Sequence, residues 1–278
     1  MNPSLVGSEM CIRDSIYRYM FDGEIWHWNS NPYKTTPSEI AFLPEEFNPN
    51  GEYEWINYPQ YSSPYPPLLQ PFFILFQSLS QWEEEIWKLL YFFVEVVFCI
   101  YLVKKNIYCA VLFSSPLLLW YGNIQGHIEA LLWIPMYWAW FHRKKNIVAA
   151  MLGMLKIWPL IFTLPLLKEK RLLTFFGLGI GTFTSIFFLL QYPINSGLAA
   201  YINHWQMNDW VFNVWEKLTP YALTTDKKIW NAVLTLLLII IAVKNKTPYY
   251  SLFFAFLVLQ PCPQPWYFMM GLPILLSK

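Results

Sequence analysis

The pattern of polar and apolar positions divides the chain into two parts. Residues 16–67 are polar and rich in aromatic side chains, beginning IYRYMFDGEIWHWNSNPYKTTP and ending NYPQYSSPYPP. From residue 68 onward, long apolar runs alternate with short polar or basic segments. Because about 20 apolar residues span a bilayer as a helix, the pattern predicts an all-α polytopic membrane protein with about 8–9 transmembrane or re-entrant helices. Residues 16–67 are expected to form a long N-terminal extracytoplasmic loop, and residues 68–278 a multi-helix transmembrane domain.

Several of the apolar runs are short enough to form broken, tilted or partly inserted helices. Pro159 and Pro165 favour two half-helices within one run, because proline removes a helical hydrogen bond and clashes with the preceding turn. The expected helices cover residues 68–81, 86–103, 107–121, 125–141, 147–167, 172–192, 229–243, 248–260 and 266–276.

The basic residues of the short loops predict the orientation, since lysine and arginine are enriched on the cytoplasmic side. Residues 16–67, the turn before His127 and a second outer loop at 193–228 then fall together on the extracytoplasmic side. The basic residues that define the cytoplasmic side are Lys104, Lys105, Arg143, Lys144, Lys145, Lys168, Lys170, Arg171, Lys244 and Lys246.

Composition agrees with an integral membrane protein. The chain is 56% hydrophobic, 20% aromatic and 13% charged, and its mean hydropathy is +0.31. Its 15 Trp and 18 Tyr suit the aromatic belts at membrane surfaces. A net charge of +1 without a basic cluster argues against nucleic acid as a partner. Four cysteines without paired spacing indicate neither a disulfide framework nor a metal site. A divalent cation is the one cofactor that the sequence leaves open.

Residues 1–15, MNPSLVGSEMCIRDS, differ from the rest of the chain. They contain no apolar run long enough for a signal sequence, and VGSEMCIRDS is similar to a translated sequencing-adapter sequence. We therefore expect residues 1–15 to be a non-native scar, the native chain to start near Ile16, and at least one N-terminal helix to be missing.

Polar side chains within apolar runs are the first candidates for function, although many such groups only pair inside a helix bundle. His127 and Glu129 are two positions apart and do not share a helix face, which argues against a two-ligand zinc site. Either contact with a sugar or phosphate or helix packing would explain them. Lys156 either extends toward the surface near a helix break or pairs with an anion. Glu95 is interpreted as a hydrogen-bonding group within the bundle.

Two polar segments add further candidates. The segment YINHWQMNDWVFNVW places Trp205 and Asn208 among aromatic rings, which suits either carbohydrate binding or an interfacial helix. Asp22 and Glu24 are the carboxylates of the opening segment. A carboxylate in a partly desolvated cleft can act as a general base, although surface acids are more common than catalytic ones.

The opening segment resembles the first extracytoplasmic loop of the C-type glycosyltransferase superfamily, in particular bacterial polyprenol-phosphate-mannose-dependent mannosyltransferases. The motifs that carry the resemblance occur in the family's order: Arg18–Tyr19, Asp22–Gly23, Asn31–Tyr33 and Tyr65–Pro67. Downstream, GHIEA, LKIWPL, HWQMNDWVF and QPWYFMMGLP also resemble motifs of that superfamily.

The sequence departs from the family pattern in two places. Ser15 and Ile16 stand where the family has an acid before YRY, and Gln264 stands where relatives often have histidine. The leading catalytic acid is therefore expected to be absent, with Asp22 as its substitute.

The resemblance implies transfer of a hexose, mannose being favoured, from a polyprenyl-phosphate donor to a hydroxyl of a glycan or lipid-linked acceptor. The reaction would take place on the extracytoplasmic side of the bacterial inner membrane. A transporter or flippase for a lipid-linked sugar, or an inactive fragment of the enzyme, are the alternatives. The implied catalytic residues are Asp22 and Glu24, and the implied donor-binding residues are Arg18, Tyr19, Tyr65, His127, Glu129, Lys156, Trp205, Asn208 and Trp266.

Overall fold

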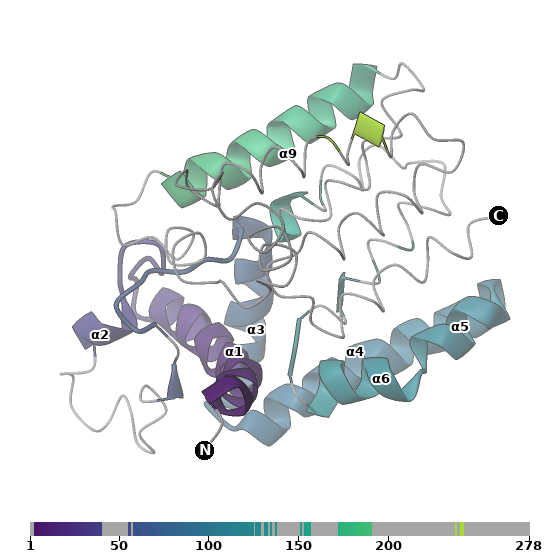
Figure 1. Ribbon diagram of the computed structural model, residues 1–278, viewed down its shortest axis with the longest axis horizontal. Coiled ribbons are helices and arrows are strands. Elements are labelled where there is room, and N and C mark those ends of the chain that lie inside the picture. Colours follow the sequence, from purple (N-terminus) through teal and green to yellow (C-terminus); the bar gives the residue numbers. More distant parts are fainter. Residues whose placement is uncertain are drawn as a thin grey trace, which may run out of the picture.

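The computed structural model describes residues 3–40, 55, 56, 58–124, 126–128, 131, 132, 134, 137, 151, 153–156, 172–190, 237, 240 and 241. Over these residues the regular secondary structure is helical, without a strand, and the expectation of an all-α protein is confirmed to that extent. Helices α1 and α3 lie side by side, α4, α5 and α6 run together along one edge, and α9 lies on the opposite edge (Figure 1).

The first element is helix α1 (Pro3–His27), which is followed by the single turn α2 (Pro37–Ile40). Residues 16–27, which we expected within a loop, are therefore helical, and no change of secondary structure marks the expected boundary after residue 15. The reason lies in the apolar positions of this segment. Ile16, Tyr19 and Met20 recur at helical spacing on one buried face, and Phe21 and Ile25, four positions apart, form a second one.

Two faces of α1 are covered by different parts of the chain. One face packs on α3, and the other contacts a small apolar cluster in which Phe21 and Ile25 meet Ile40 and Ile56. The helix ends at His27, after which Asn29 adopts a left-handed conformation with φ 54°. Residues 28–40 thus fold back on α1.

Helix α3 (Gln70–Ser80) follows the short 3₁₀ turn η3 (Pro67–Leu69) and agrees with the expected helix at 68–81. Proline occupies the first turn of each of these elements, where the missing N–H would have no helical partner. The helix ends where Gln81 takes a left-handed conformation and its N–H donates to the Gln77 carbonyl at 2.9 Å. This cap turns the chain directly into the next helix.

Helix α4 (Glu84–Lys105) extends the expected helix at 86–103 by two residues at each end. Glutamates begin the helix and lysines end it, which complements the helix dipole. One stripe of the helix faces inward, and its first two rings contact Phe76 of α3 with centroids 5.5 and 5.3 Å away. The stripe consists of Trp87, Tyr91, Glu95, Phe98 and Leu102.

The prediction of a single helix at 107–121 was wrong, because three short helical elements occupy this region. They are α5 (Ile107–Phe113), α6 (Pro116–Leu119) and the π-helical turn η4 (Trp120–Ile124). Pro116 lacks the N–H that a continuous helix would use, so α5 ends before it. A side-chain oxygen of Asn106 caps α5 by accepting from the N–H groups of Tyr108 and Cys109 at 3.1 and 3.2 Å.

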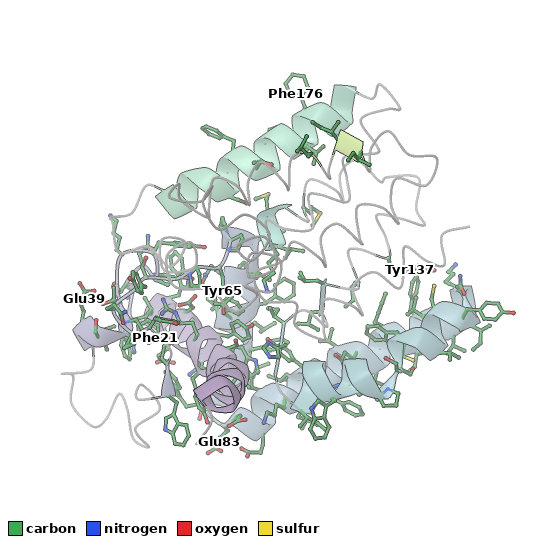
Figure 2. All side chains as sticks on the ribbon, in the orientation of Figure 1. Phe21, Glu39, Tyr65, Glu83, Tyr137 and Phe176 are labelled. Carbon is green, nitrogen blue, oxygen red and sulfur yellow. The ribbon has the colours of Figure 1, made fainter. Side chains whose placement is uncertain are left out.

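Helix α9 (Leu172–Leu190) agrees with the expected helix at 172–192. Its Ser185 hydroxyl donates to the carbonyl of Gly153 at 2.6 Å, while Phe176 points away from the rest of the chain (Figure 2). Of the expected helices at 125–141, 147–167 and 229–243 the structure describes only scattered residues. Those at 248–260 and 266–276, and the outer loop at 193–228, lie outside the described residues.

Among the described residues, one helix is long and apolar enough to cross a membrane by length and composition. This helix is α4, with 22 residues, a mean hydropathy of 2.1 and 28% of its apolar window buried. Large apolar side chains cover the outward side of α4, and the most exposed are Leu89, Phe93, Val97, Ile100 and Val103.

Candidate functional site

The most concentrated polar site in the described residues surrounds the Asp22 carboxylate on α1. Asp22 is fully buried, and its two oxygens receive hydrogen bonds from three different segments. Arg18 Nε, one turn earlier on α1, lies 3.2 Å from Oδ1. The Ser63 hydroxyl donates to Oδ2, and Gln70 Nε2 at the start of α3 lies 3.5 Å from the same oxygen.

The partners of Asp22 are themselves fixed by further hydrogen bonds. Arg18 Nη2 donates to the Tyr61 carbonyl at 2.9 Å, and the guanidinium lies 5.6 Å from the centre of the Phe21 ring. Gln70 also donates to the Ser63 hydroxyl at 3.2 Å and accepts from Trp26 Nε1 at 3.0 Å. Arg18 is therefore directed at Asp22 and a backbone carbonyl in this structure, with 6% of its surface exposed.

Burial and hydrogen bonding act in opposite directions on this carboxyl group. Burial raises the pKa of Asp22 above its ordinary value of 3.8, whereas Arg18, Ser63 and Gln70 lower it, and burial is the larger influence. A carboxyl group whose pKa is raised accepts a proton more readily, which suits it to a role as general base.

The motif residues of the opening segment assemble this site. Gly23 allows α3 to approach, because a Cβ placed on it would lie 2.3 Å from the Phe73 carbonyl oxygen. The side chain of Asn31 accepts from the Tyr33 N–H at 2.9 Å and forms a turn. The Tyr33 hydroxyl then donates to the Tyr65 carbonyl at 2.6 Å. The DG motif therefore lets α1 pack closely on α3, and the NPY and YPP motifs bind each other beside Ser63.

Tyr19 connects this site to the GHIEA segment. Its ring is buried and stacks on the ring of Phe73, with 4.9 Å between the ring centroids. The Tyr65 ring packs edge-on against it at the same centroid distance. The Tyr19 hydroxyl is hydrogen-bonded to the Tyr65 side chain and to the backbone of Ile128. Gly126, with φ +68°, leaves no room for a side chain beside Ile16 of α1. Residues far apart in sequence thus meet around Tyr19.

The remaining predicted donor-binding residues are placed in part. His127 is buried, with 3% of its surface exposed, and it interacts electrostatically with Lys156. The structure therefore brings these two donor-binding candidates together beside the Tyr19 contact at Ile128. Four predicted residues lie outside the described residues: Glu129, Trp205, Asn208 and Trp266.

Glu24, the second predicted catalytic acid, is a residue of α1 whose side chain contacts α3. It accepts from Gln77 Nε2 at 2.9 Å and is partly exposed, unlike Asp22. One turn further along α1, His27 shares a hydrogen bond of 2.9 Å with the Ser78 hydroxyl. These two hydrogen bonds add polar contacts between α1 and α3.

Ser63, Gln70 and Gln77 were not predicted from the sequence. A signal for the two glutamines exists, because residues seven positions apart lie on one helix face and both are amides in an otherwise apolar run. Asn123, which donates to the Glu95 carboxylate from the π-helical turn η4, was not predicted either. Ser63 lies in an irregular segment, where no periodicity marks it.

Within the described residues, no group of three or more His, Cys, Asp or Glu side chains is arranged to hold a metal ion. Compared with known proteins, the chain matches no family model, no curated protein and no solved structure.

Proposed function

We propose that this protein is a polytopic membrane glycosyltransferase. It transfers a hexose, mannose being favoured, from a polyprenyl-phosphate donor to an acceptor hydroxyl on the extracytoplasmic side. The observation that carries the proposal is the convergence of motifs separated by up to about 110 residues. The RY and DG motifs contain Arg18 and Asp22, the NPY and YPP motifs bind each other beside Ser63, and Tyr19 joins this region to the GHIEA segment that contains His127.

The chemistry requires a base for the acceptor hydroxyl and positive charge for the leaving phosphate. The acceptor oxygen attacks the anomeric carbon, the bond from that carbon to the phosphate oxygen breaks, and polyprenyl phosphate leaves with the bonding electrons. We assign the hydroxyl proton to Asp22 and the leaving phosphate to His127 and Lys156. Arg18, directed at Asp22 and Tyr61, acts as a positioning residue in this assignment.

The Ser63 hydroxyl suggests how an acceptor would reach the base. It donates to Asp22 Oδ2 within a closed, buried network. An acceptor hydroxyl has the same donor chemistry, so it can replace the serine at this oxygen when the 61–65 segment moves outward. The remaining Arg18 contact then keeps the carboxylate oriented.

The outward side of α4 supports a membrane location. The helix is about 33 Å long at 1.5 Å per residue, comparable to the hydrocarbon thickness of a bilayer. Its exposed apolar side chains suit lipid tails and the polyprenyl chain of the donor. The lysines at its end favour the proposed orientation, which would put Glu84 and the Asp22 site on the outer side.

The test is transfer of labelled mannose from polyprenyl phosphate by membranes that contain the full chain. Asp22→Asn keeps the shape of the side chain but removes the base, and we expect transfer to fall about 10²- to 10⁴-fold. Ser63→Ala removes only the competing hydroxyl and is expected to retain transfer within about tenfold. Glu39→Gln is the matched control, because Glu39 is an exposed carboxylate of the same opening segment.

Three results would contradict parts of the proposal. Normal transfer by Asp22→Asn would reject Asp22 as the base, and equal losses in Asp22→Asn and Glu39→Gln would reject the site. Binding of the sugar lipid without transfer to any acceptor would favour a transporter or flippase.

A further inference from the structure

Helix α4 contains a polar group at a depth where its neighbours are apolar. Glu95 occupies the middle of the inward stripe of α4, with 2% of its surface exposed. It faces the π-helical turn η4, which contacts α4. Single π-helical turns are rare and occur frequently at functional sites. The Asp22 site does not include Glu95.

Glu95 and Asn123 satisfy each other only in part. Asn123 Nδ2 donates to Glu95 Oε2, so one oxygen of the carboxylate is used. In the described part of the chain, no donor lies within hydrogen-bonding distance of the buried atoms Glu95 Oε1 and Asn123 Oδ1. Leaving a buried acceptor without a donor costs about 1–3 kcal/mol for each atom. The pair therefore holds two buried acceptor atoms side by side, both able to accept from a donor that the described residues do not supply.

The surroundings of the pair suit a polyhydroxyl ligand. Tyr91 lies one turn before Glu95 on the same stripe and contributes an aromatic ring, while Gly122, next to Asn123, is buried and contributes no side chain. Sugars present hydroxyl donors on their edges and C–H groups on a face, and the second can lie against a ring. The two acceptors match the hydroxyl edge of a sugar, and the Tyr91 ring, packed on Phe76 and Trp87, provides an aromatic neighbour.

We propose that Glu95 and Asn123 bind hydroxyl groups of the hexose, with Glu95 Oε1 and Asn123 Oδ1 each accepting from a sugar hydroxyl. This proposal rests on the proposed function. It adds that the inward stripe of α4 recognises the hexose of the substrate. Glu95 thereby acts as a specificity-determining residue, separate from the base and from the phosphate-binding groups.

The experiment measures binding of mannosyl phosphoryl polyprenol, and of its 2-, 3-, 4- and 6-deoxy analogues, to the detergent-purified full chain. Wild type is expected to bind at least one analogue about 10- to 100-fold more weakly than the parent, because a site built to accept a hydroxyl rejects the analogue without it. Glu95→Gln and Asn123→Leu are expected to weaken the parent by a similar factor and to lose the discrimination. If the substitutions only disturbed the fold, affinity for the parent and for all analogues would fall by the same factor, and the discrimination between them would remain.

Cys99→Ala is the matched control. Cys99 lies one turn after Glu95 on α4, and its Sγ contacts the Ser114 hydroxyl at 3.1 Å, so its replacement also changes a polar contact of α4. It is expected to bind every analogue as wild type does. Size-exclusion profiles and melting temperatures establish that each variant is folded, and Asn123→Leu provides the test if Glu95→Gln is not.

The outcomes separate this proposal from the proposed function. Unchanged discrimination in both variants overturns the Glu95 and Asn123 site, whatever the transfer activity is. Lost discrimination with no transfer by wild type supports the sugar site and overturns the transferase. Wild-type protein that binds neither mannosyl phosphoryl polyprenol nor its analogues overturns both.

Discussion

The close approach of α1 and α3 at Gly23 gives a prediction that can be worked out from distances. In Gly23→Ala, the new Cβ would lie 2.3 Å from the Phe73 carbonyl oxygen, 2.7 Å from its carbonyl carbon and 2.8 Å from Gln77 Cβ. Close carbon-to-oxygen contacts in proteins are about 3.3–3.6 Å, so the helices must separate by about 1 Å. Two of the three atoms are backbone, which a rotamer change cannot move away.

Two effects of opposite sign determine the size of the change. Alanine favours a helix over glycine by about 1 kcal/mol, which stabilises the variant. Overpacking a well-packed contact costs about 1–3 kcal/mol, and the backbone atoms at Gly23 place it at the upper end. The expected net loss is about 2 kcal/mol, or about 4–8 °C in melting temperature, since 1 kcal/mol corresponds to about 2–4 °C in chains of this size.

Gly179 provides the matched control. It lies within α9, and a Cβ placed on it would meet no atom within 4 Å. Gly179→Ala keeps the helix-propensity gain and adds no clash, so it should leave the melting temperature unchanged or raise it by a few degrees. The measurement is intrinsic fluorescence during heating of each full-length variant in the same detergent. If Gly23→Ala melts at or above the wild-type temperature, α1 and α3 are not in contact at Gly23.

Three further predictions concern the surroundings of the site. Gly126→Ala should lower the melting temperature, because its φ of +68° disfavours a side chain and its Cβ would lie 2.8 Å from Ile16 Cδ1; adding Ile16→Val should restore part of the loss. Burial raises the pKa of Asp22, so the folded protein is most stable when this carboxyl group is protonated. This stability is lost as the pH rises from 3.8 through the raised pKa, and melting temperatures of Asp22→Asn should lack that pH-dependent decline. Tyr17→Phe should destabilise by about 1 kcal/mol in the same assay, because the hydroxyl donates to Glu84 at 2.7 Å; unchanged melting would reject this link between α1 and α4.

The apolar pattern alone was enough to predict three of the helices that the structure describes. The runs at 68–81, 86–103 and 172–192 correspond to α3, α4 and α9, because length and hydropathy dominate where a helix is apolar. The pattern failed at 107–121, where the single residue Pro116 outweighed the continuous apolar run. The existence of a helix is a property of many residues, whereas its interruption depends on one.

The site could be predicted only as a set of residues, without their partners. Arg18 and Asp22 are four positions apart, so their contact follows from helical spacing once residues 16–27 are recognised as a helix. We took the polarity of that segment as evidence for a loop and overlooked its apolar stripe. Ser63 and Gln70 reach Asp22 from 41 and 48 residues away, and no local pattern encodes such a contact.

The distance along the chain between Asp22 and Gln70 also has a consequence for biosynthesis. At about 5–20 residues per second, roughly 2–10 s pass between the synthesis of Asp22 and that of Gln70. Until Tyr61 and Ser63 are made, Arg18 and Asp22 have only each other, and the contact from Gln70 comes last. Helix α1 therefore cannot reach its final position when it is made. It docks when α3 arrives, and Gln70, the first residue of α3, completes the closure.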